Sequence, residues 1–331
     1  MTAQQGQALV VTRHGGPEVL ELQQSQPPLP GPGPHELAVD VAAAGVNFVD
    51  VYQREGVYPI PTPFVLGSEG AGVVTAIGEQ VSEFAVGDRV AWASSLTGSA
   101  ATTALVAEGS AVPVPVGVDS AVAAASMLQG LTAHYLLNST YAVQPGDTVL
   151  VHAAAGGVGQ LLIQLAKAKG ATVIGTVSTA AKADRARTVG ADHIINYLDV
   201  ADVGAAVRDL TGGIGVAAVY DGVGKSTFEG SLAALRIRGT LALFGAASGQ
   251  VPPFDLQRLN RAGSLFVTRP TLVHYIATRQ ELLQRSNDIL GAVANGSLIV
   301  EIGGRYPLSD AATAYGDLEG RRTMGKLLLI P

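Results

Sequence analysis

The sequence predicts an α/β protein in which a barrel-like β domain accompanies a doubly wound parallel-sheet domain. A glycine-rich stretch near the middle of the chain has the pattern strand, turn, helix, strand. After it, apolar strand patterns alternate with helical patterns, whereas short apolar runs broken by Gly and Pro come before it. Alternation of this kind is typical of parallel sheets, and short runs separated by turn residues are typical of antiparallel barrels.

The first domain is expected to span residues 1–125. Its apolar runs are QALVVT, ELAVDVAAAGV, AGVVTAIG, DRVAWA, ATTALVA and AVPVP. The end of the chain shows a long helical pattern at about 272–295 and short strands near 298–303 and 326–330. We expect residues 270–331 to rejoin and complete the first domain.

The second domain is expected to span residues 126–269, and it begins with a helical lead-in, MLQGLTAHYLLNSTYAV. Its periodicity predicts a doubly wound parallel sheet. Helices are predicted at 158–169, 180–189, 201–210 and 226–236, and strands at 148–153, 172–177, 193–196, 216–220, 240–244 and 264–268.

The glycine-rich stretch, GDTVLVHAAAGGVGQLLIQLAKAKGATVIGTV, indicates a dinucleotide site. Its spacing is Ala154-x-Gly156-x-x-Gly159, so that alanine replaces the first glycine of the usual fingerprint. A backbone without Cβ can approach a pyrophosphate closely, and the helix that begins there directs N–H groups at the anion. Gly156, Gly157 and Val158 are therefore expected to line the pyrophosphate.

The choice of coenzyme is indicated at the end of the second strand of this unit. NAD sites usually place a carboxylate there, but this strand ends in Val177-Ser178-Thr179 and Lys182 follows. A hydroxyl and a cation suit a 2′-phosphate, which a carboxylate would repel. The sequence favours NADPH over NADH, although Lys182 could also be an ordinary exposed cation on a helix.

Composition excludes several classes of protein. The 331 residues are 47% hydrophobic and 15% charged, carry a net charge of −6 and include no cysteine. Disulfides and thiolate ligands are excluded, and the acidic balance argues against nucleic acid as a partner. No apolar stretch is long enough to span a membrane, and MTAQQGQALVV lacks the pattern of a signal peptide. We expect a cytoplasmic protein.

Three stretches together resemble the zinc-free medium-chain dehydrogenase/reductase superfamily, in particular its quinone oxidoreductase (ζ-crystallin-like) branch. They are AAAGVNFVDVYQREGVYP, PFVLGSEGAGVVTAIGEQVSEFAVGDRV and GDTVLVHAAAGGVGQLLIQLAK, and the closing LEGRRTMGKLLLIP is also similar. The resemblance implies a GroES-like β-barrel catalytic domain and a Rossmann NADP(H)-binding domain. It also implies hydride transfer from NADPH to a quinone.

The resemblance implies chemistry without a metal. Where zinc alcohol dehydrogenases have a cysteine this chain has Gly45, Val46 and Asn47, and Gly67-Ser68-Glu69 replaces their Gly-His-Glu. A conjugated acceptor needs no Lewis acid, since its own oxygens take up the charge. Two alternatives remain open: an NADPH-dependent enone or alkenal reductase, and a non-catalytic NADPH-binding protein associated with RNA.

The resemblance also implies roles for individual residues. Asn47 and Tyr52 would face the nicotinamide in a cleft between the domains, although Asn47 could serve a turn and Tyr52 could be an ordinary half-buried aromatic. The remaining coenzyme contacts would come from Thr132, from Ser178, Lys182, Tyr197 and Arg321 around the 2′-phosphate, and from Gly222, Phe244 and Gly245 around the nicotinamide half.

Other polar residues are interpreted as structural. His134, His152 and His193 lie in separate segments without ligand spacing, His152 inside the first predicted strand. Asp50 and Glu69 are interpreted as hydrogen-bonding groups rather than a catalytic pair. Finally, SLFVTRP (264–270) predicts an apolar strand at the sheet edge, and the resemblance implies that it pairs with its copy in a homodimer.

Overall fold

The computed structural model describes residues 6–24 and 31–331, and the chain separates into two compact units. Unit 1 comprises Met1–Leu131 and Ala277–Pro331, and unit 2 comprises Thr132–Ile276. The first five residues, on which part of the signal-peptide expectation depends, lie outside the described residues. In the described ranges, no helix is long and apolar enough to cross a membrane.

Unit 1 is a β domain organised around one long strand, β3 (Glu36–Val46). Its side chains alternate between the core and the outside, so that Leu37, Val39 and Val41 are buried. Register shifts after Ala38 and Val41 interrupt its ladder with β5. Such bulges bend a strand, and β3 pairs in an antiparallel manner with β5, β7 and β16.

The other strands and the helices of unit 1 have the following bounds. The strands are β1 (Gln7–Val11), β2 (Leu20–Gln24), β4 (Phe64–Val65), β5 (Gly70–Ile77), β6 (Arg89–Trp92), β7 (Thr103–Ala107), β8 (Val112–Pro113), β15 (Ile302–Pro307) and β16 (Lys326–Ile330). The helices are α1 (Phe48–Arg54), α8 (Arg279–Ala294) and α9 (Ala311–Glu319), while α2 (Ser120–Tyr135) extends from unit 1 into unit 2.

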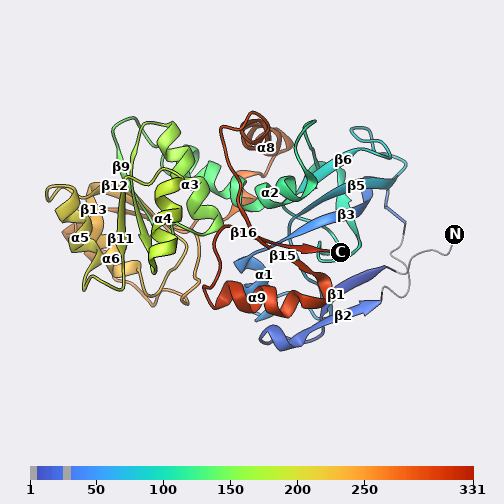
Figure 1. Ribbon diagram of the computed structural model, residues 1–331, viewed down its shortest axis with the longest axis horizontal. Helices are drawn as coiled ribbons and strands as arrows, with labels where there is room; N and C mark the ends of the chain where they lie inside the picture. The colour runs from blue at the N-terminus through green and yellow to red at the C-terminus, as the bar shows by residue number, and fades with distance from the viewer. Residues whose placement is uncertain (1–5, 25–30) are drawn as a thin grey trace. The chain divides into compact units, whose positions relative to one another are not determined.

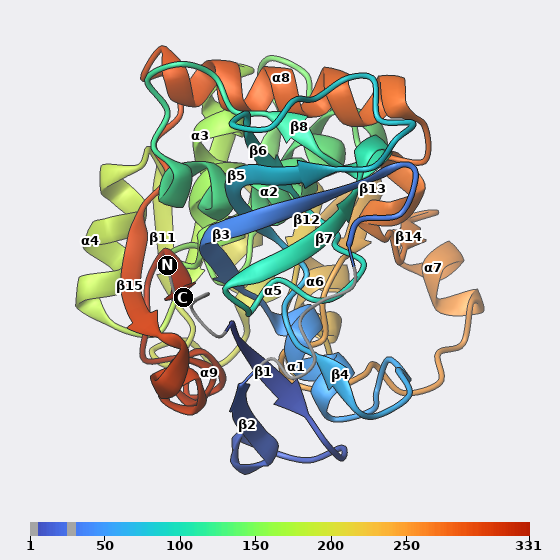
Figure 2. The ribbon, with the colours of Figure 1, turned by 90° about the vertical axis from the view of Figure 1, so that its right-hand side faces the viewer.

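Two sheets make up unit 1. The larger has the order β15-β16-β3-β5-β6-β8 with β7 also paired to β3, and the smaller has the order β2-β1-β4. Figure 1 shows the red carboxyl-terminal strands β15 and β16 beside the blue β3. Figure 2 shows β1 and β2 below the larger sheet. The last two strands of the chain therefore complete the larger sheet, whose earliest strand in the sequence is β3.

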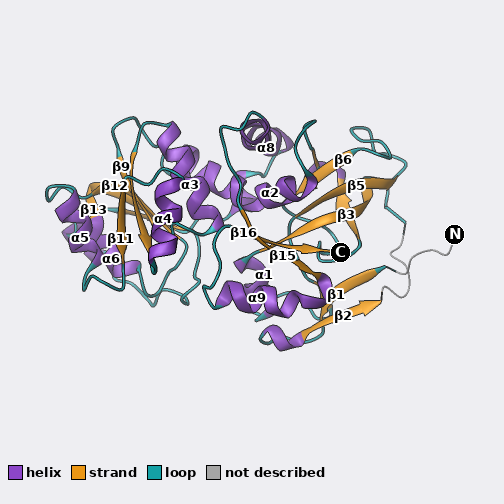
Figure 3. Cartoon of the chain, in the orientation of Figure 1, coloured by secondary structure: helices purple, strands orange, loops and turns teal. Residues whose placement is uncertain are grey.

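Unit 2 is a six-stranded parallel sheet of order β11-β10-β9-β12-β13-β14. Helices α3 and α4 lie on one face of this sheet and α5 and α6 on the other (Figure 3). The strands are β9 (Thr148–Val151), β10 (Thr172–Val177), β11 (His193–Asn196), β12 (Val216–Asp221), β13 (Leu235–Leu243) and β14 (Phe266–Thr268). The helices are α3 (Gly157–Ala168), α4 (Ala180–Thr188), α5 (Val203–Leu210), α6 (Phe228–Ala234) and α7 (Gln257–Arg261).

The strand order confirms the predicted α/β fold with a doubly wound sheet. From β9 the chain adds β10 and β11 on one side and then β12, β13 and β14 on the other. Ligands of such sheets bind outside the carboxyl ends of the strands where the order reverses. Here that point lies between β9 and β12.

Several predicted boundaries were wrong for identifiable reasons. β9 ends at Val151 because Ala153 has a φ of 50°, and β14 begins after Ser264, whose φ is 55°. The predicted helix at 272–295 begins at Arg279 and not earlier, since Thr278 accepts the N–H of Glu281 and caps it. The penultimate strand is Ile302–Pro307 and not 298–303.

Candidate active site

The glycine turn between β9 and α3 has the backbone that its sequence predicts. Gly156 is the N-cap of α3 and its N–H donates to the carbonyl of Ala153 at 2.9 Å. A Cβ on Gly159 would collide with the same carbonyl, so that only glycine fits there. Gly157 and Val158 form the first turn of the helix.

The alanine in place of the first glycine has a packing partner. Ala154 is fully buried, and its methyl lies against Gly175 of β10, where a Cβ would come within 2.8 Å of it. A small residue on each side therefore keeps the turn close to the sheet. No side chain caps the start of α3, whose N-cap is the glycine itself. A helix N-terminus of this kind fits a pyrophosphate.

The residues predicted around the 2′-phosphate in unit 2 lie at one corner of the sheet. Ser178 directly follows β10, and Thr179 caps α4 by accepting the N–H of Lys182 at 3.3 Å. The N–H of Tyr197 donates to the carbonyl of Val177 at 3.0 Å, which places Tyr197 beside the end of β10. Residues 177–182 include no carboxylate, so this corner fits a phosphate.

The residues predicted around the nicotinamide half also lie together. The N–H of Phe244 donates to the carbonyl of Asp221 at 2.9 Å, next to Gly222. A Cβ on Gly222 would come within 2.9 Å of the Phe244 ring, and one on Gly245 would collide with the carbonyl of Gly222. Thr132 lies apart from them on α2 and is 7% exposed.

Asn47 and Tyr52 lie on α1 in unit 1. Asn47 is the N-cap of the helix and is 4% exposed. The Tyr52 ring packs edge-on against Tyr58 with ring centroids 5.3 Å apart, and tilted against Phe48 at 6.2 Å. Arg321, predicted to join the 2′-phosphate group, also belongs to unit 1, and its role there stays a prediction.

A buried ion pair, which was not predicted from the sequence, contacts both polar atoms of the Asn47 side chain. The Lys326 ammonium pairs with the Glu69 carboxylate, and the two side chains are 1% and 0% exposed. The same ammonium donates to Asn47 Oδ1 at 2.7 Å, and Asn47 Nδ2 donates to Glu69 Oε1 at 2.7 Å. Glu69 Oε2 accepts the N–H of Leu128 at 2.6 Å. A single cation at the start of the otherwise apolar KLLLI strand is the signal that could have identified Lys326.

Asp50 lies beside this pair and holds the start of α1. It accepts the N–H of Asn47 at 2.9 Å and the hydroxyls of Ser68 and Tyr315, each at 3.1 Å. Complete burial raises the pKa of Asp50 to about 6, although the Asn47 N–H, the Lys326 ammonium and the Ser68 hydroxyl act in the opposite direction. Burial and the neighbouring Asp50 raise the pKa of Tyr315 well above its usual range. Asp50 and Glu69 are therefore buried hydrogen-bonding groups, and their having no catalytic role stays a prediction.

The donor set around Glu69 does not fit a metal ion. Its two oxygens already accept from an ammonium, a carboxamide and a main-chain N–H. A Cβ on Gly45 would collide with the Glu69 carboxylate, so that little space remains beside this carboxylate. Within residues 6–24 and 31–331, no group of three or more His, Asp or Glu side chains is arranged to hold a metal.

The three histidines interpreted from the sequence as structural, His134, His152 and His193, differ in burial and in position. His193 begins β11 and is exposed, whereas His134 is buried on α2. His152 follows β9 directly, so that its predicted position inside the strand was wrong. It is 4% exposed and contacts the hydroxyls of Thr176 and Ser231 at 3.0 Å each.

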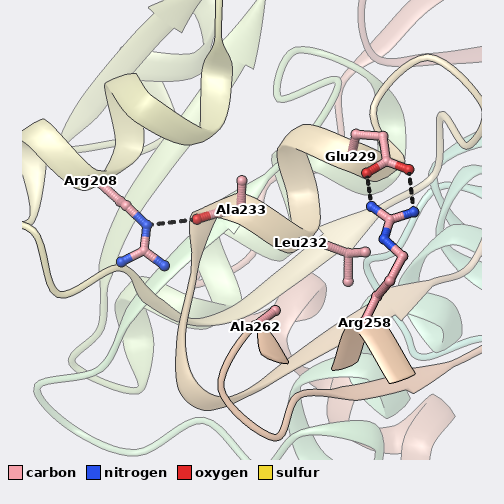
Figure 4. Close-up of a pocket in the computed structure, with 6 residues that line it drawn as sticks. All are labelled: Arg208, Glu229, Leu232, Ala233, Arg258 and Ala262. Atoms are coloured by element: carbon pink, nitrogen blue, oxygen red, sulfur yellow. Dashed lines mark hydrogen bonds and ion pairs between the residues drawn. The ribbon is translucent and has the colours of Figure 1, made fainter. Parts of the chain in front are cut away.

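A separate hollow of about 310 Å³ lies beside helices α5, α6 and α7 of unit 2, and Figure 4 shows its six lining residues. None of the predicted coenzyme residues lines it. The Arg208 guanidinium donates to the carbonyls of Ala233, Gly213 and Leu235, and Arg258 pairs with Glu229. With both arginines engaged in this way, the hollow offers little to an anion.

Two family models match the chain. Residues 33–137 match the alcohol dehydrogenase GroES-like domain, and residues 157–288 match the zinc-binding dehydrogenase model. The first match covers strands β3 to β8 of unit 1, and the second begins at Gly157 in the glycine turn and covers most of unit 2.

Proteins similar over nearly their whole length accompany these matches. A quinone oxidoreductase of Salmonella typhimurium is 46% identical over 322 residues, which are 96% of this chain and 98% of that one. A 2-haloacrylate reductase of a Burkholderia species is 41% identical, with 98% of each chain covered.

Solved structures are also similar to this chain over nearly its whole length. An Escherichia coli quinone oxidoreductase complexed with NADPH has a TM-score of 0.95 at 43% identity, covering 98% of this chain and 100% of that chain. A mycobacterial protein complexed with NADPH has a TM-score of 0.95 at 50% identity and the same coverage. This chain belongs to the quinone oxidoreductase branch of the medium-chain dehydrogenase/reductase superfamily.

Proposed function

We propose that this protein is an NADPH-dependent quinone oxidoreductase. The observation that carries the proposal is the glycine turn at the start of α3, with a phosphate-compatible corner at Ser178 and Lys182 on the same sheet. The family supports the same activity, since relatives 46% identical are quinone oxidoreductases and similar structures hold NADPH.

The coenzyme would be held in two parts, mainly by residues of unit 2. The N–H groups of the first turn of α3, with Gly156, Gly157 and Val158, would receive the pyrophosphate. The hydroxyl of Ser178 and the ammonium of Lys182 would bind the 2′-phosphate, together with Tyr197 and Arg321. These residues should bind NADPH more tightly than NADH, because the 2′-hydroxyl of NADH carries no charge that could attract the Lys182 ammonium.

When bound, the coenzyme supplies a hydride from its nicotinamide. Gly222, Phe244, Gly245 and Thr132 would orient the nicotinamide half, and Asn47 and Tyr52 would serve the acceptor side. A quinone spreads the incoming charge over its own conjugated oxygens, so the protein mainly needs to position the two reactants and exclude water. The reaction as proposed therefore uses no metal.

The surroundings of Asn47 limit what it can do. Its carboxamide oxygen accepts from Lys326, and its nitrogen donates to Glu69 and, at 3.4 Å, to the carbonyl of Gly45. One orientation of the amide satisfies all three contacts. We propose that Asn47 presents a fixed edge to its ligand, while Tyr52 contributes ring surface and a hydroxyl.

A second candidate activity is reduction of an activated carbon–carbon double bond. The observation in its favour is the 41% identical relative named a 2-haloacrylate reductase, whose substrate name denotes an α,β-unsaturated acid. The same coenzyme geometry serves both acceptors, which differ in the shape that the pocket must accommodate.

One assay separates the two activities. NADPH oxidation should be followed spectroscopically with a small benzoquinone, with an α,β-unsaturated ketone and with a 2-haloacrylate, each in the presence and absence of EDTA. Turnover of the quinone that is unaffected by EDTA supports the proposal. Turnover of the alkenes alone would replace it with the second activity, and inhibition reversed by zinc would contradict the metal-free reaction.

We also propose that the protein acts as a homodimer paired through β14. Within residues 6–24 and 31–331, this strand has only β13 as a neighbour in the sheet, and Phe266 and Val267 on it are 60% and 38% exposed. An apolar strand edge tends to be paired or covered, and the same strand in a second copy fits it by twofold symmetry.

A further inference from the structure

Four polar side chains form a buried hydrogen-bonded chain beneath the coenzyme turns of unit 2. Thr176 comes from β10, His152 follows β9, Ser231 lies on α6 and Asp221 ends β12. Their exposed fractions are 1%, 4%, 0% and 0%. Successive contacts are 3.0 Å from Thr176 to His152 Nδ1, 3.0 Å from His152 Nε2 to Ser231, and 2.8 Å from Ser231 to Asp221.

The direction of every bond in this chain follows from its acidic end. The Asp221 carboxylate can only accept, so the Ser231 hydroxyl donates to it and its oxygen is left to accept from His152. His152 must then carry its proton on Nε2, and its bare Nδ1 accepts the hydroxyl of Thr176. Burial lowers the pKa of His152, which keeps the ring neutral and this arrangement intact.

The chain joins two turns that the coenzyme would contact. On one side, the N–H of His152 donates to Tyr220 and that of Ala154 donates to Thr176, at 3.1 and 3.0 Å. Ala153 lies between these two anchors with a φ of 50°, a conformation that a non-glycine residue adopts only when its surroundings enforce it. On the other side, Asp221 accepts the N–H groups of Val223 and Gly224 at 2.8 and 3.0 Å.

We propose that His152, as its Nε2–H tautomer, is a positioning residue that fixes the glycine turn and the Gly222 turn relative to each other. It acts through the backbone and not by touching the coenzyme. The inference rests on the proposed use of NADPH and adds which part of the coenzyme depends on this chain. That part is the pyrophosphate and nicotinamide half, since the 2′-phosphate corner at Ser178 and Lys182 is held by separate contacts of α4.

Ligands that contain different parts of the coenzyme test the proposal. The dissociation constants of NADPH, NADH and adenosine 2′-monophosphate should be measured by calorimetry for the wild type, Ser231→Ala, Thr176→Val and the conservative Thr176→Ser. Ser231→Ala and Thr176→Val should weaken NADPH and NADH alike, by about tenfold. Adenosine 2′-monophosphate, which lacks the pyrophosphate and the nicotinamide half, should bind as to the wild type, and Thr176→Ser should keep the affinity for both coenzymes.

Two results would overturn the proposal. One is unchanged coenzyme affinity in the folded Ser231→Ala variant, and the other is an equal loss for all three ligands, which indicates general destabilisation. Should Thr176→Val fail to fold, Ser231→Ala carries the test, because Asp221 retains the N–H groups of Val223 and Gly224 and the hydroxyl of Thr227.

An independent measurement separates this inference from the proposed function. ¹⁵N NMR of histidine-labelled protein reports which ring nitrogen of His152 carries the proton, whether or not any coenzyme binds. A proton on Nδ1, or a charged ring at pH 7, would refute the inference. If the wild type instead shows the Nε2–H tautomer but binds neither coenzyme, the bond directions stand, whereas the positioning role fails together with the proposed function.

Discussion

At the residue scale, Lys182 is the side chain on which coenzyme choice is proposed to depend. It lies in the first turn of α4, one turn from the Ser178 corner, and its N–H is bound to Thr179. Replacing Lys182 by Ala should weaken NADPH binding about tenfold or more, since a charge-assisted bond to phosphate is lost. NADH binding should change little. Fluorescence titration with both coenzymes measures the difference.

Arg187 provides a matched control on the same helix. It is an exposed cation that pairs with Asp184 at 3.0 Å, so that Arg187→Ala removes the same charge away from the proposed corner. This control should leave both dissociation constants within about twofold of the wild type. An equal loss of NADPH and NADH affinity in Lys182→Ala would contradict a role at the 2′-phosphate.

Asp50 gives a pH dependence whose sign follows from its burial. Its pKa is raised from 3.8 to about 6 on folding, so the folded protein binds more protons than the unfolded chain between these values. Stability is therefore lost as pH rises through this window, and the loss is complete above about 6.

The variant Asp50→Asn lacks this titration and isolates the effect. It should be less stable than the wild type at pH 4.5, since an amide oxygen cannot accept from Asn47, Ser68 and Tyr315 together. The difference in the free energy of unfolding between the wild type and the variant should decrease by about 2 kcal/mol between pH 4.5 and pH 7.5, because only the wild type acquires a buried charge. Urea denaturation at both pH values measures it, and a gap that does not vary with pH would contradict the raised pKa.

Residue types at motif positions could be interpreted from sequence, but partners distant in the chain could not. The role of Gly156 follows from its spacing, because the need for close backbone approach is local. Lys326 is 257 residues from Glu69, and nothing in either segment specifies the other. The chain from Thr176 to Asp221 likewise forms only when three strand ends and a helix meet.

At the element scale, the Glu69–Lys326 pair connects β16 to the segment before β5 and to the N-cap of α1. Removing one partner leaves a buried charge, so Lys326→Met should destabilise the protein by about 3 kcal/mol or more. The double variant Glu69→Gln/Lys326→Met should recover much of that loss, since both charges are gone and the introduced carboxamide oxygen can still accept the N–H of Leu128.

A double-mutant cycle measured by chemical denaturation tests this coupling. Lys225→Met, at an exposed position, serves as the control for loss of a lysine and should change stability by less than about 0.5 kcal/mol. If the two single changes at Glu69 and Lys326 simply add, the pair is not the unit that holds these elements.

Element types were more predictable than element ends. The periodicities at 172–177, 193–196 and 326–330 gave strands with the bounds that the structure has. β9 and β14 differ because Ala153 and Ser264 adopt positive φ values, which residue type alone does not indicate. The start of α8 was predicted about seven residues too early, although Thr278 and Glu281 have the spacing of a capping box.

At the scale of the whole molecule, the sequence supports the class of each unit better than its strand pairing. Alternating strand and helix patterns indicate a parallel sheet, and the right-handed crossover rule restricts how consecutive strands are added. The pairing of β16 with β3 has no such local signal, since the two strands lie at opposite ends of the chain. The return to short strand patterns near the end of the chain predicted a discontinuous first domain, but not which strand β16 would pair with.

Exposed apolar side chains lie around β14, the strand through which we propose that the homodimer pairs. Phe266 on the strand and Ile237 beside the preceding turn are 60% and 73% exposed, and a Cβ on Gly263 would contact Ile237. Leu198, 70% exposed, follows the opposite edge strand β11 and provides the control. Phe266→Lys should convert a dimer to a monomer in sedimentation velocity, because like charges would meet across the twofold axis, whereas Leu198→Lys should remain dimeric. A wild-type protein that sediments as a monomer at all concentrations, or a Phe266→Lys variant that stays dimeric, would show that β14 is not the pairing edge.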